Sequence, residues 1–486
     1  MIRRTHKIYN RETELSWLGE IADLAQRTAH MVVIAGRRRI GKTELIRQFA
    51  SGRSDVLYLF VSKKKPQALL EEFRDLLAER VPLIKTASFR NFEDFFAVVF
   101  KVMKEQPLII VLDEFQNFEV VESSVFSTIQ NLWDREKDRI TGAFVFIGSV
   151  HTLMQKIFEG KKESLFGRAT ARLYLEPLEP DAVAEILADN GQDPVALLPF
   201  YDTLFGGIPK YYFLADRYRL YGKSQGTVIR TLYMDRNAPL QNEGRELLIE
   251  EFGKNYHLYF TILQVIAGGE TQMARIADRA GINVNSISKY LDELVSYYRV
   301  IERRLPVTET AAGKKIGRYY LKDQALRFWF RYIFRNQSLI EIGDTEGLTS
   351  KILKDLPTLM GKSFEALVRT LLIRKNVEAP LPFRFSRIGG FWNRTGDVEI
   401  DVVAMNEETK EILFGECKLN GNRFSSADAG RLKEKAAQVR WNRENRRVSF
   451  ALFSMTALSS AQKEALQRDG ITSFDLKDLL PSKINS

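Results

Sequence analysis

The feature that most constrains the fold is a glycine-rich segment that directly follows a short apolar run. Residues 31–35, MVVIA, have the length and β-branched composition of a buried strand, and residues 36–43 read GRRRIGKT. The residues that follow, ELIRQFA, have the periodicity of a helix. This arrangement matches the phosphate-binding pattern GxxxxGK(S/T), which lies between a strand and a helix. The sequence therefore predicts an α/β nucleotide-binding domain with a parallel sheet.

Each residue type in this segment suits phosphate chemistry. Gly36 and Gly41 let the backbone curl so that its amides face phosphate oxygens. Lys42 is expected to contact the β and γ phosphates, and Thr43 to offer its hydroxyl to Mg²⁺. ATP and Mg²⁺ are therefore the expected cofactors.

Polar residues follow two further apolar runs. Residues 107–112, PLIIVL, lead into Asp113 and Glu114. We expect Asp113 to hold the water shell of the magnesium ion and Glu114 to orient and polarise the attacking water. Residues 143–147, AFVFI, lead into a Gly-Ser turn that would place Ser149 beside the γ-phosphate, although such a turn is also ordinary loop chemistry.

An arginine downstream of these strands could complete the site from a neighbouring subunit. Arg168 is the candidate for such an arginine finger, and Arg172 is an alternative that the sequence does not separate from it. A finger of this kind requires a homo-oligomer. An ordinary surface arginine in a loop is the competing interpretation.

The first half of the chain resembles the archaeal-type ATPase family, on the AAA+/STAND side of the P-loop NTPases. The resemblance rests on YNRETEL at 9–15, the glycine-rich loop, LDEFQ at 112–116, the Gly-Ser turn and LFGR at 165–168. It implies an ATPase core over 1–180 and a helical lid over 181–250, where GGIP at 206–209 resembles the lid signature. It also implies that Arg11 belongs to the nucleotide site.

Residues 251–345 are expected to form a winged helix. Helical runs at 259–266 and 282–295 flank a helix at 273–279 that Thr271 would cap, and two strands are expected at 300–303 and 317–321. DNA binding would use polar side chains of the recognition helix and lysines of the wing tip, namely Asn285, Ser286, Lys289, Lys314 and Lys315. Winged helices attached to such ATPases also serve as packing or partner modules.

Residues 346–486, after a linker expected at 344–347, carry an ordered set of charged residues. Glu365 lies on an amphipathic helix, Asp401 lies in an apolar strand, and a second strand ends in Glu416-Cys417-Lys418. Residues two apart in a strand face the same side, so Glu416 and Lys418 project together. Asp401 and Glu416 could chelate Mg²⁺, and Lys418 could position the attacking water and stabilise a pentavalent phosphate.

This order resembles the PD-(D/E)XK restriction-endonuclease-like superfamily and, more closely, the domain of unknown function that frequently trails archaeal-type ATPases. The resemblance implies a nuclease-like α/β fold and adds Glu365 to the metal ligands. The usual proline before the first aspartate is absent, because Ile400 stands there. Cleavage and a degenerate, non-cleaving version of the fold are therefore both open.

Charge is distributed unevenly along the chain. The net charge of the chain is +10. Residues 1–250 contain 35 Lys and Arg and 34 Asp and Glu, residues 251–350 contain 14 and 11, and residues 351–486 contain 23 and 17. This surplus favours a polyanionic partner for the last two regions, although solvated surface lysines would give the same count.

One cysteine and four histidines exclude a disulfide scaffold and a Cys/His zinc site. We expect a cytoplasmic protein with no membrane segment.

Two functions are compatible with these features. The first is an ATP-hydrolysing protein that acts on DNA, in which the nucleotide state controls a winged helix and a metal-dependent nuclease, in genome defence, repair or mobile-element control. The second is a non-cleaving nucleotide switch that assembles with protein partners and uses the C-terminal domain as a scaffold.

Overall fold

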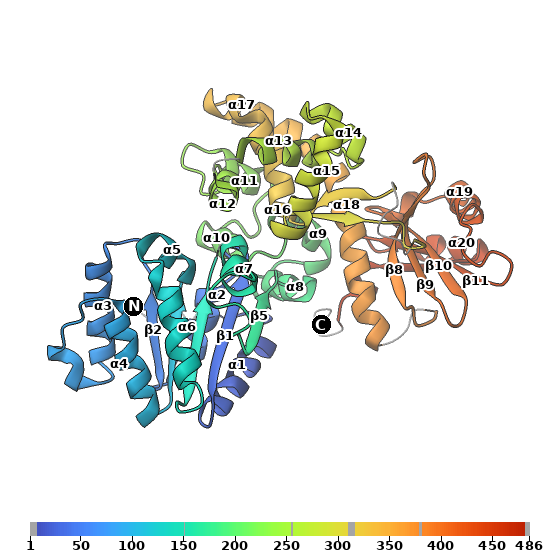
Figure 1. The fold of residues 1–486 in the computed structure, drawn as a ribbon. Coiled ribbons are helices and arrows are strands. Elements are labelled where there is room, and N and C mark those ends of the chain that lie inside the picture. The colour runs from blue at the N-terminus through green and yellow to red at the C-terminus, as the bar shows by residue number, and fades with distance from the viewer. Residues whose placement is uncertain (1–6, 150, 254–255, 310–315, 379–381, 482–486) are drawn as a thin grey trace. The chain divides into compact units, whose positions relative to one another are not determined.

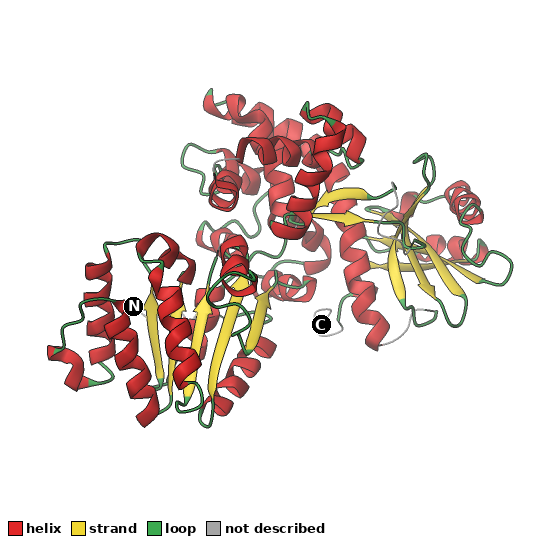
Figure 2. Ribbon diagram, in the orientation of Figure 1, coloured by secondary structure: helices red, strands yellow, loops and turns green. Residues whose placement is uncertain are grey.

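The chain folds into two compact units. The structure is a computed structural model that describes residues 7–149, 151–253, 256–309, 316–378 and 382–481. Unit 1 comprises 1–177 and 208–210, and unit 2 comprises 178–207 and 211–486. Each unit contains a five-stranded sheet, and helices surround both sheets (Figures 1 and 2). The predicted α/β fold class is confirmed.

Unit 1 is built on a parallel sheet with strand order β2-β3-β4-β1-β5 (Figure 1). The three central strands are buried almost throughout, as the apolar runs predict for a sheet covered on both faces. Because all strands run in one direction, their carboxyl ends meet at one edge, where the glycine-rich loop and Asp113 lie. The strands are β1 (Ala29–Gly36), β2 (Val56–Phe60), β3 (Leu108–Asp113), β4 (Gly142–Ile147) and β5 (Ala171–Leu175).

A phenylalanine-rich core covers one face of this sheet. Phe73, Phe95 and Phe144 are fully buried in it, together with residues of β1, β2 and β3. Helices α1 and α2 contact β1. The helices of unit 1 are α1 (Glu12–Ala25), α2 (Lys42–Ala50), α3 (Pro66–Ala78), η1 (Pro82–Thr86), α4 (Phe92–Glu105), η2 (Phe115–Asn117), α5 (Phe118–Val121), α6 (Ser124–Glu136) and α7 (His151–Glu159).

Short helices follow the parallel sheet in the chain. Asp193 caps α9 by accepting from the backbone N–H groups of Val195 and Ala196, and Gly206 ends that helix in the left-handed conformation. These helices are α8 (Pro180–Asp189), α9 (Pro194–Phe205), α10 (Pro209–Arg217), α11 (Gln225–Ile229), η3 (Arg230–Met234) and α12 (Glu243–Phe252).

Three helices and an antiparallel hairpin come next in the chain. The helices are α13 (Tyr256–Ala267), α14 (Met273–Ala280) and α15 (Val284–Asp292), followed by η5 (Glu293–Tyr297), and the strands of the hairpin are β6 (Ile301–Arg304) and β7 (Arg318–Leu321). This is the three-helix and hairpin order expected of a winged helix. The expectation that Thr271 caps α14 was wrong: Gln272 occupies the N-cap position, and the carbonyl of Thr271 instead accepts the N–H of Tyr319.

Helix α18 (Thr345–Glu378) is 34 residues long and connects the winged helix to the C-terminal sheet. The linker expected at 344–347 was wrong, because the helix begins at Thr345 and the Asp344 carboxylate accepts the N–H of Gly347. Between the hairpin and α18 lie α16 (Gln324–Phe328), η6 (Trp329–Ile333), η7 (Phe334–Asn336) and α17 (Gln337–Glu341).

The C-terminal sheet is mixed, with order β12-β11-β10-β9-β8. Strands β10, β11 and β12 are parallel, whereas β9 is antiparallel to both β8 and β10. Its elements are β8 (Arg387–Trp392), β9 (Glu399–Asn406), β10 (Glu411–Lys418), η8 (Gly421–Arg423), α19 (Ser426–Ala437), β11 (Arg447–Ser454), α20 (Ser460–Arg468), β12 (Ile471–Asp475) and α21 (Leu476–Leu479).

Candidate functional site

The glycine-rich loop joins β1 to α2, and its two glycines have backbone angles that favour glycine. Gly36 has φ of +155°, and a Cβ added there would lie 2.7 Å from the carbonyl oxygen of Leu175 on β5. Gly41 has φ of +94° and precedes the first residue of α2. A side chain at either position would strain the loop, so its path depends on these glycines.

Lys42 is folded back onto the loop. Its Nζ donates to the carbonyl oxygens of Gly36 at 2.7 Å and Arg37 at 2.9 Å, and its side chain is buried. The ammonium group is therefore held where backbone amides and a helix N-terminus also favour negative charge.

Asp113 lies at the end of β3 and is surrounded by neutral donors. Its Oδ2 accepts from Thr43 Oγ1 at 2.9 Å and from Tyr58 Oη at 2.6 Å, and its Oδ1 accepts the N–H of Glu114 at 2.8 Å. Burial, followed by the hydrogen bond to Asp113, raises the pKa of Tyr58. The hydroxyl of Thr43 and the carboxylate of Asp113 are hard oxygen donors side by side, so this pair fits Mg²⁺.

Glu114 is held by one side chain from its own stretch of chain and one from the end of β4. Its Oε2 accepts from Ser149 Oγ at 2.7 Å and from Nε2 of Gln116. The backbone of Glu114 has φ of +56°, which is uncommon for a residue with a side chain. The structure thus brings Glu114 and Ser149 together as the strand ends predict. Sequence reasoning gave no role to Gln116, although it belongs to the LDEFQ stretch.

Arg11 donates hydrogen bonds to the backbone of the glycine-rich loop and of the segment after β5. Its Nη2 donates to the carbonyl oxygens of Glu176 at 2.7 Å and Ile40 at 3.5 Å, and its Nη1 pairs with Glu14 at 2.8 Å. Because Arg11 is buried, these contacts connect the start of the chain to the glycine-rich loop and to the end of β5.

The two finger candidates differ in their contacts. Arg168 forms a bidentate ion pair with Asp134, with Nε at 3.0 Å from Oδ1 and Nη2 at 2.6 Å from Oδ2. Arg172 is exposed and donates to the carbonyl oxygen of Phe158 at 3.4 Å. Arg168 as a finger stays a prediction, and it would require that ion pair to open.

The polar residues predicted on the recognition helix lie on the surface. Asn285, Ser286 and Lys289 of α15 are exposed, while Ile287 and Leu291 face the core. The wing-tip residues Lys314 and Lys315 lie outside the described residues.

The carboxylates of the C-terminal domain meet where β9 and β10 cease to pair. The last registered pair is Gly415 with Val402, and beyond it Oδ2 of Asp401 accepts the N–H of Cys417 at 2.9 Å. Burial, together with the nearby carboxylates of Glu365 and Glu416, raises the pKa of Asp401 to about 7. The carboxylates of Glu365 on α18 and Glu416 on β10 therefore act electrostatically on that of Asp401 on β9.

Lysines neutralise two of these carboxylates. Lys418 Nζ lies 2.7 Å from Glu416 Oε1, and Lys362 Nζ lies 3.0 Å from Glu365 Oε1. Burial lowers the pKa of Lys362, but Glu365 and Glu399 outweigh burial and raise it to about 12. Sequence reasoning missed Lys362, although it lies one helical turn before Glu365.

Among the residues that the structure describes, no group of three or more His, Cys, Asp or Glu side chains is arranged to hold a metal ion.

A buried lysine and a threonine at the start of α2, with an aspartate and a glutamate at the end of β3, define a P-loop ATPase. The comparisons with known proteins agree. Residues 8–211 match a family described as "ATPase domain predominantly from Archaea", and residues 329–432 match one described as "Archaea bacterial proteins of unknown function".

A relative from Methanocaldococcus jannaschii, the uncharacterised protein MJECL04, is 32% identical over 410 residues, which cover 84% of this chain and 87% of the relative. The chain belongs to the archaeal-type ATPase family, and its C-terminal part is the domain of unknown function expected from the resemblance.

Two solved structures give further likenesses. The Walker-type ATPase PABY2304 of Pyrococcus abyssi shares 16% identity with a TM-score of 0.51, over 67% of this chain and 97% of that one, which indicates a common fold. The ORC2 protein of Aeropyrum pernix, solved in ADPNP and ADP complexes, shares 15% identity with a TM-score of 0.43, over 72% and 97%. No helix among the described residues is long and apolar enough to cross a membrane.

Proposed function

We propose that the ATPase of unit 1 controls a DNA-acting module in unit 2, made of the winged helix and the C-terminal sheet. The observation that carries the proposal is the meeting of Glu365, Asp401 and Glu416 with Lys418 at the point where β9 and β10 separate. Three carboxylates and a lysine at one end of a mixed sheet suit metal-dependent hydrolysis of a phosphodiester. The charge surplus of this half of the chain favours a nucleic-acid substrate.

The residues of the nucleotide site have separate roles in this proposal. Lys42 leaves the loop carbonyls for the β and γ phosphates of ATP, and Glu114 orients the attacking water and takes its proton. Ser149 and Gln116 fix the direction of the Glu114 carboxylate. Thr43 and Asp113 would hold Mg²⁺, which neutralises phosphate charge when bound.

The C-terminal carboxylates would act through oxygen donors. Asp401 and Glu416, with Glu365, are not arranged as a metal site among the described residues, so they would hold Mg²⁺ only after the lysines release Glu416 and Glu365. The ion would lower the pKa of bound water when present. Lys418 stabilises charge on the phosphate oxygens after it releases Glu416. The exposed Asn285, Ser286 and Lys289 would contact DNA from the winged helix.

Cleavage tests this proposal directly. Supercoiled plasmid, linear duplex and single-stranded DNA are incubated with Mg²⁺ or Mn²⁺, with and without ATP. We expect cutting by the wild type, a loss of at least about 100-fold in Asp401→Asn and Lys418→Ala, and ordinary cutting by Arg443→Ala, which removes an exposed arginine of the same domain. Cutting that persists in Lys418→Ala would refute the nuclease assignment.

A second candidate function is a non-cleaving, ATP-dependent scaffold for protein partners. The direct pairing of Glu416 with Lys418 and of Glu365 with Lys362 favours it, because lysines already balance those charges. A wild-type protein that never cuts would support the scaffold. Salt-dependent DNA binding that disappears when Lys314 and Lys315 are neutralised would argue against it.

A further inference from the structure

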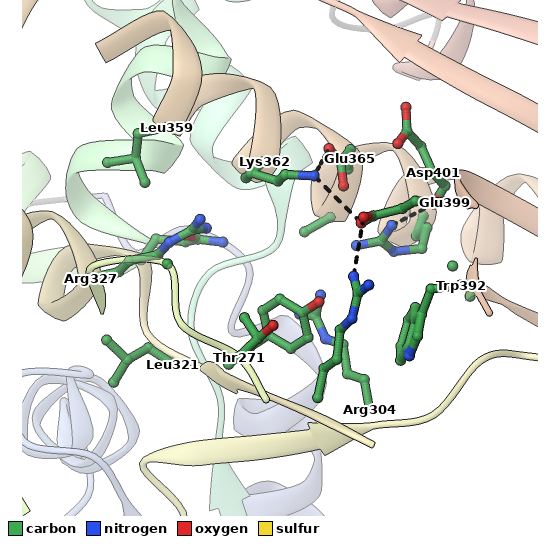
Figure 3. A pocket seen from close by; sticks show the side chains of 18 of the residues that line it. Thr271, Arg304, Leu321, Arg327, Leu359, Lys362, Glu365, Trp392, Glu399 and Asp401 are labelled. Atoms are coloured by element: carbon green, nitrogen blue, oxygen red, sulfur yellow. Dashed lines mark hydrogen bonds and ion pairs between the residues drawn. The ribbon is translucent and has the colours of Figure 1, made fainter. Parts of the chain in front are cut away.

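A cavity of about 660 Å³ lies in unit 2 between the hairpin strands β6 and β7, which form the wing, helix α18 and strands β8 and β9 (Figure 3). Glu365, Glu399 and Asp401 line it, so it reaches the carboxylates described above. Its lining is nevertheless rich in cations, which are Arg304, Arg318, Arg327, Arg331, Lys362 and Arg369.

Hydrogen bonds and an ion pair between the winged helix and the C-terminal sheet hold the walls of this cavity together. The N–H of Val307 donates to the carbonyl oxygen of Gly390 at 2.9 Å, and Trp392 Nε1 donates to the carbonyl oxygen of Ile316 at 2.8 Å. Arg318 pairs with Glu399 at 3.1 Å. The wing and the sheet therefore present their charged side chains to one space.

Most of the cavity cations have carboxylate partners. Arg331 pairs with Asp355 at 2.8 Å, Lys362 pairs with Glu365 at 3.0 Å, and Arg304 pairs with Glu302. These pairs, like that of Arg318, balance charge within the protein and leave little for a ligand.

Arg327 and Arg369 differ from the other cations of the cavity. Within the described part of the chain, the guanidinium of Arg327 has neither a hydrogen bond nor an ion pair, and that of Arg369 has one hydrogen bond, to the carbonyl oxygen of Asp401 at 2.7 Å. Burial, with the neighbouring Arg331, lowers the pKa of Arg327 to about 10, and burial also lowers the pKa of Arg369. Both side chains remain cationic at neutral pH. The Glu365 carboxylate attracts both of them and Asp401 attracts Arg369, but neither guanidinium forms a direct ion pair with a carboxylate among the described residues.

Such an arrangement destabilises a protein unless an anion completes it. The planar guanidinium group is the side chain best suited to a phosphate, which it can contact through two parallel hydrogen bonds. The carbonyl oxygen that Arg369 contacts belongs to Asp401, whose carboxylate is part of the carboxylate cluster. A phosphate bound to Arg369 would therefore lie in the same cavity as that cluster.

We propose that this cavity binds phosphate groups of a nucleic-acid strand, with Arg327 and Arg369 each contacting a phosphate. The inference rests on the proposed function and names the group that unit 2 recognises, a backbone phosphodiester next to Glu365 and Asp401. A strand is favoured over a free nucleotide because the wing forms one wall and because the surplus of cations extends through both regions of unit 2 that meet here.

Equilibrium binding in EDTA tests the cavity without any cleavage. Fluorescence anisotropy of a labelled single-stranded oligonucleotide is measured over a range of salt for the full-length wild type, Arg327→Gln, Arg369→Gln and the exposed control Arg443→Gln. We expect each cavity variant to bind about tenfold more weakly and to lower the slope of log K against log salt by about 0.7. The control should keep both the affinity and the slope.

Thermal unfolding of the free protein separates a ligand-binding arginine from a structural one. Removal of an unpaired buried charge should raise the Tm of Arg327→Gln by about 2–4 °C. A structural arginine would lower Tm instead, and that result would overturn the proposal. Arg327→Lys keeps the charge and should recover part of the lost affinity, which confirms that the loss did not come from misfolding.

Two further results would also overturn the proposal. One is unchanged affinity and slope in both cavity variants, and the other is displacement of the strand by excess AMP in a Lys42→Ala background, which would identify a free-nucleotide pocket. Because the assay contains no metal, DNA binding that depends on Arg327 would support the cavity even if the cleavage experiment failed. If the protein cut DNA but bound it equally well without Arg327 and Arg369, the cavity proposal would fail and the proposed function would stand.

Discussion

The nucleotide site and the carboxylate cluster both contain acidic residues and a lysine, but they satisfy these charges differently. In the nucleotide site, Asp113 accepts hydrogen bonds from a hydroxyl, a phenol and a backbone amide, and Lys42 donates to backbone carbonyls. In the carboxylate cluster, Glu416 pairs directly with Lys418 and Glu365 pairs with Lys362.

This difference concerns what a ligand must displace. A phosphate that reaches Lys42 replaces neutral carbonyl contacts, and the acidic residues nearby keep their own donors. A metal ion that reaches Glu416 or Glu365 must compete with an ammonium group for the same oxygens. We therefore expect the nucleotide site to depend strongly on single residues for activity, and the carboxylate cluster to depend on its lysines for stability as well.

The largest expected effect is the loss of ATP hydrolysis in Lys42→Ala. Because this ammonium group stabilises negative charge on the transferred phosphate, hydrolysis should fall by at least about 100-fold. Phosphate release at saturating ATP measures it, with the exposed Lys101→Ala on α4 as the matched control. Hydrolysis at the wild-type rate in Lys42→Ala would refute the assignment of this site.

The next effect separates the catalytic glutamate from the residue that orients it. Glu114→Gln should lower kcat by about 100-fold, whereas Ser149→Ala, which removes one hydrogen bond to Glu114, should lower it by about tenfold. ATP binding, followed with a fluorescent nucleotide, should change little in either variant. If Ser149→Ala lost binding and kept kcat, Ser149 would contact the nucleotide and not orient Glu114.

A stability measurement tests the difference between the two lysines. Lys418→Met leaves Glu416 without its closest cation, so the free energy of unfolding should fall by about 1 kcal/mol, a figure kept small because Lys418 is partly exposed. Lys42→Ala should change it less, since backbone carbonyls are its acceptors. Urea unfolding of both variants checks this order, and an equal loss in both would contradict the comparison.

The smallest effect concerns Asp202 of α9, whose carboxyl group has neither a hydrogen bond nor an ion pair in the described residues. Burial raises its pKa to about 7. The folded protein therefore keeps this proton to a higher pH than the unfolded chain does, and the stability it contributes is present at low pH and lost as the pH rises from about 4 to about 7.

Asp202→Asn cannot lose a proton in this way. The variant should gain stability over the wild type as the pH rises, by on the order of 1 kcal/mol at pH 8 and by less at pH 5. Urea unfolding at several pH values measures the difference, with Asp216→Asn, an exposed aspartate of α10, as the control. A difference that does not vary with pH would show that the Asp202 carboxyl group does not titrate as described.

The sequence could predict the nucleotide site because local rules determine it. A glycine loop after an apolar strand fixes the position of Lys42, and parallel strands bring Asp113 and Ser149 to the same edge without knowledge of side-chain packing. The hydrogen bond between Ser149 and Glu114 is a product of that packing, and strand order alone does not reveal it.

The C-terminal half was less predictable for physical reasons. The glycine and polar side chains of residues 344–347 predict a linker, yet residues 345–347 begin α18 because contacts elsewhere along a 34-residue helix stabilise it. Strands β11 and β12 went unpredicted. The cation-lined cavity depends on Arg327, Arg369 and Glu399, which lie far apart in the chain, so spacing carries no sign of it.

The length of α18 has a genetic consequence. The helix packs against α9, lies beside Gly226 of α11 at Thr349 and Leu353 near its start, and carries Lys362, Glu365 and Arg369 farther along. Each residue of an α-helix turns the chain by about 100°, so one inserted or deleted codon between Leu348 and Lys362 would rotate all three charged groups together out of the cavity. Substitutions along this stretch can accumulate one at a time, whereas changes in its length must come in multiples that restore the same helical face.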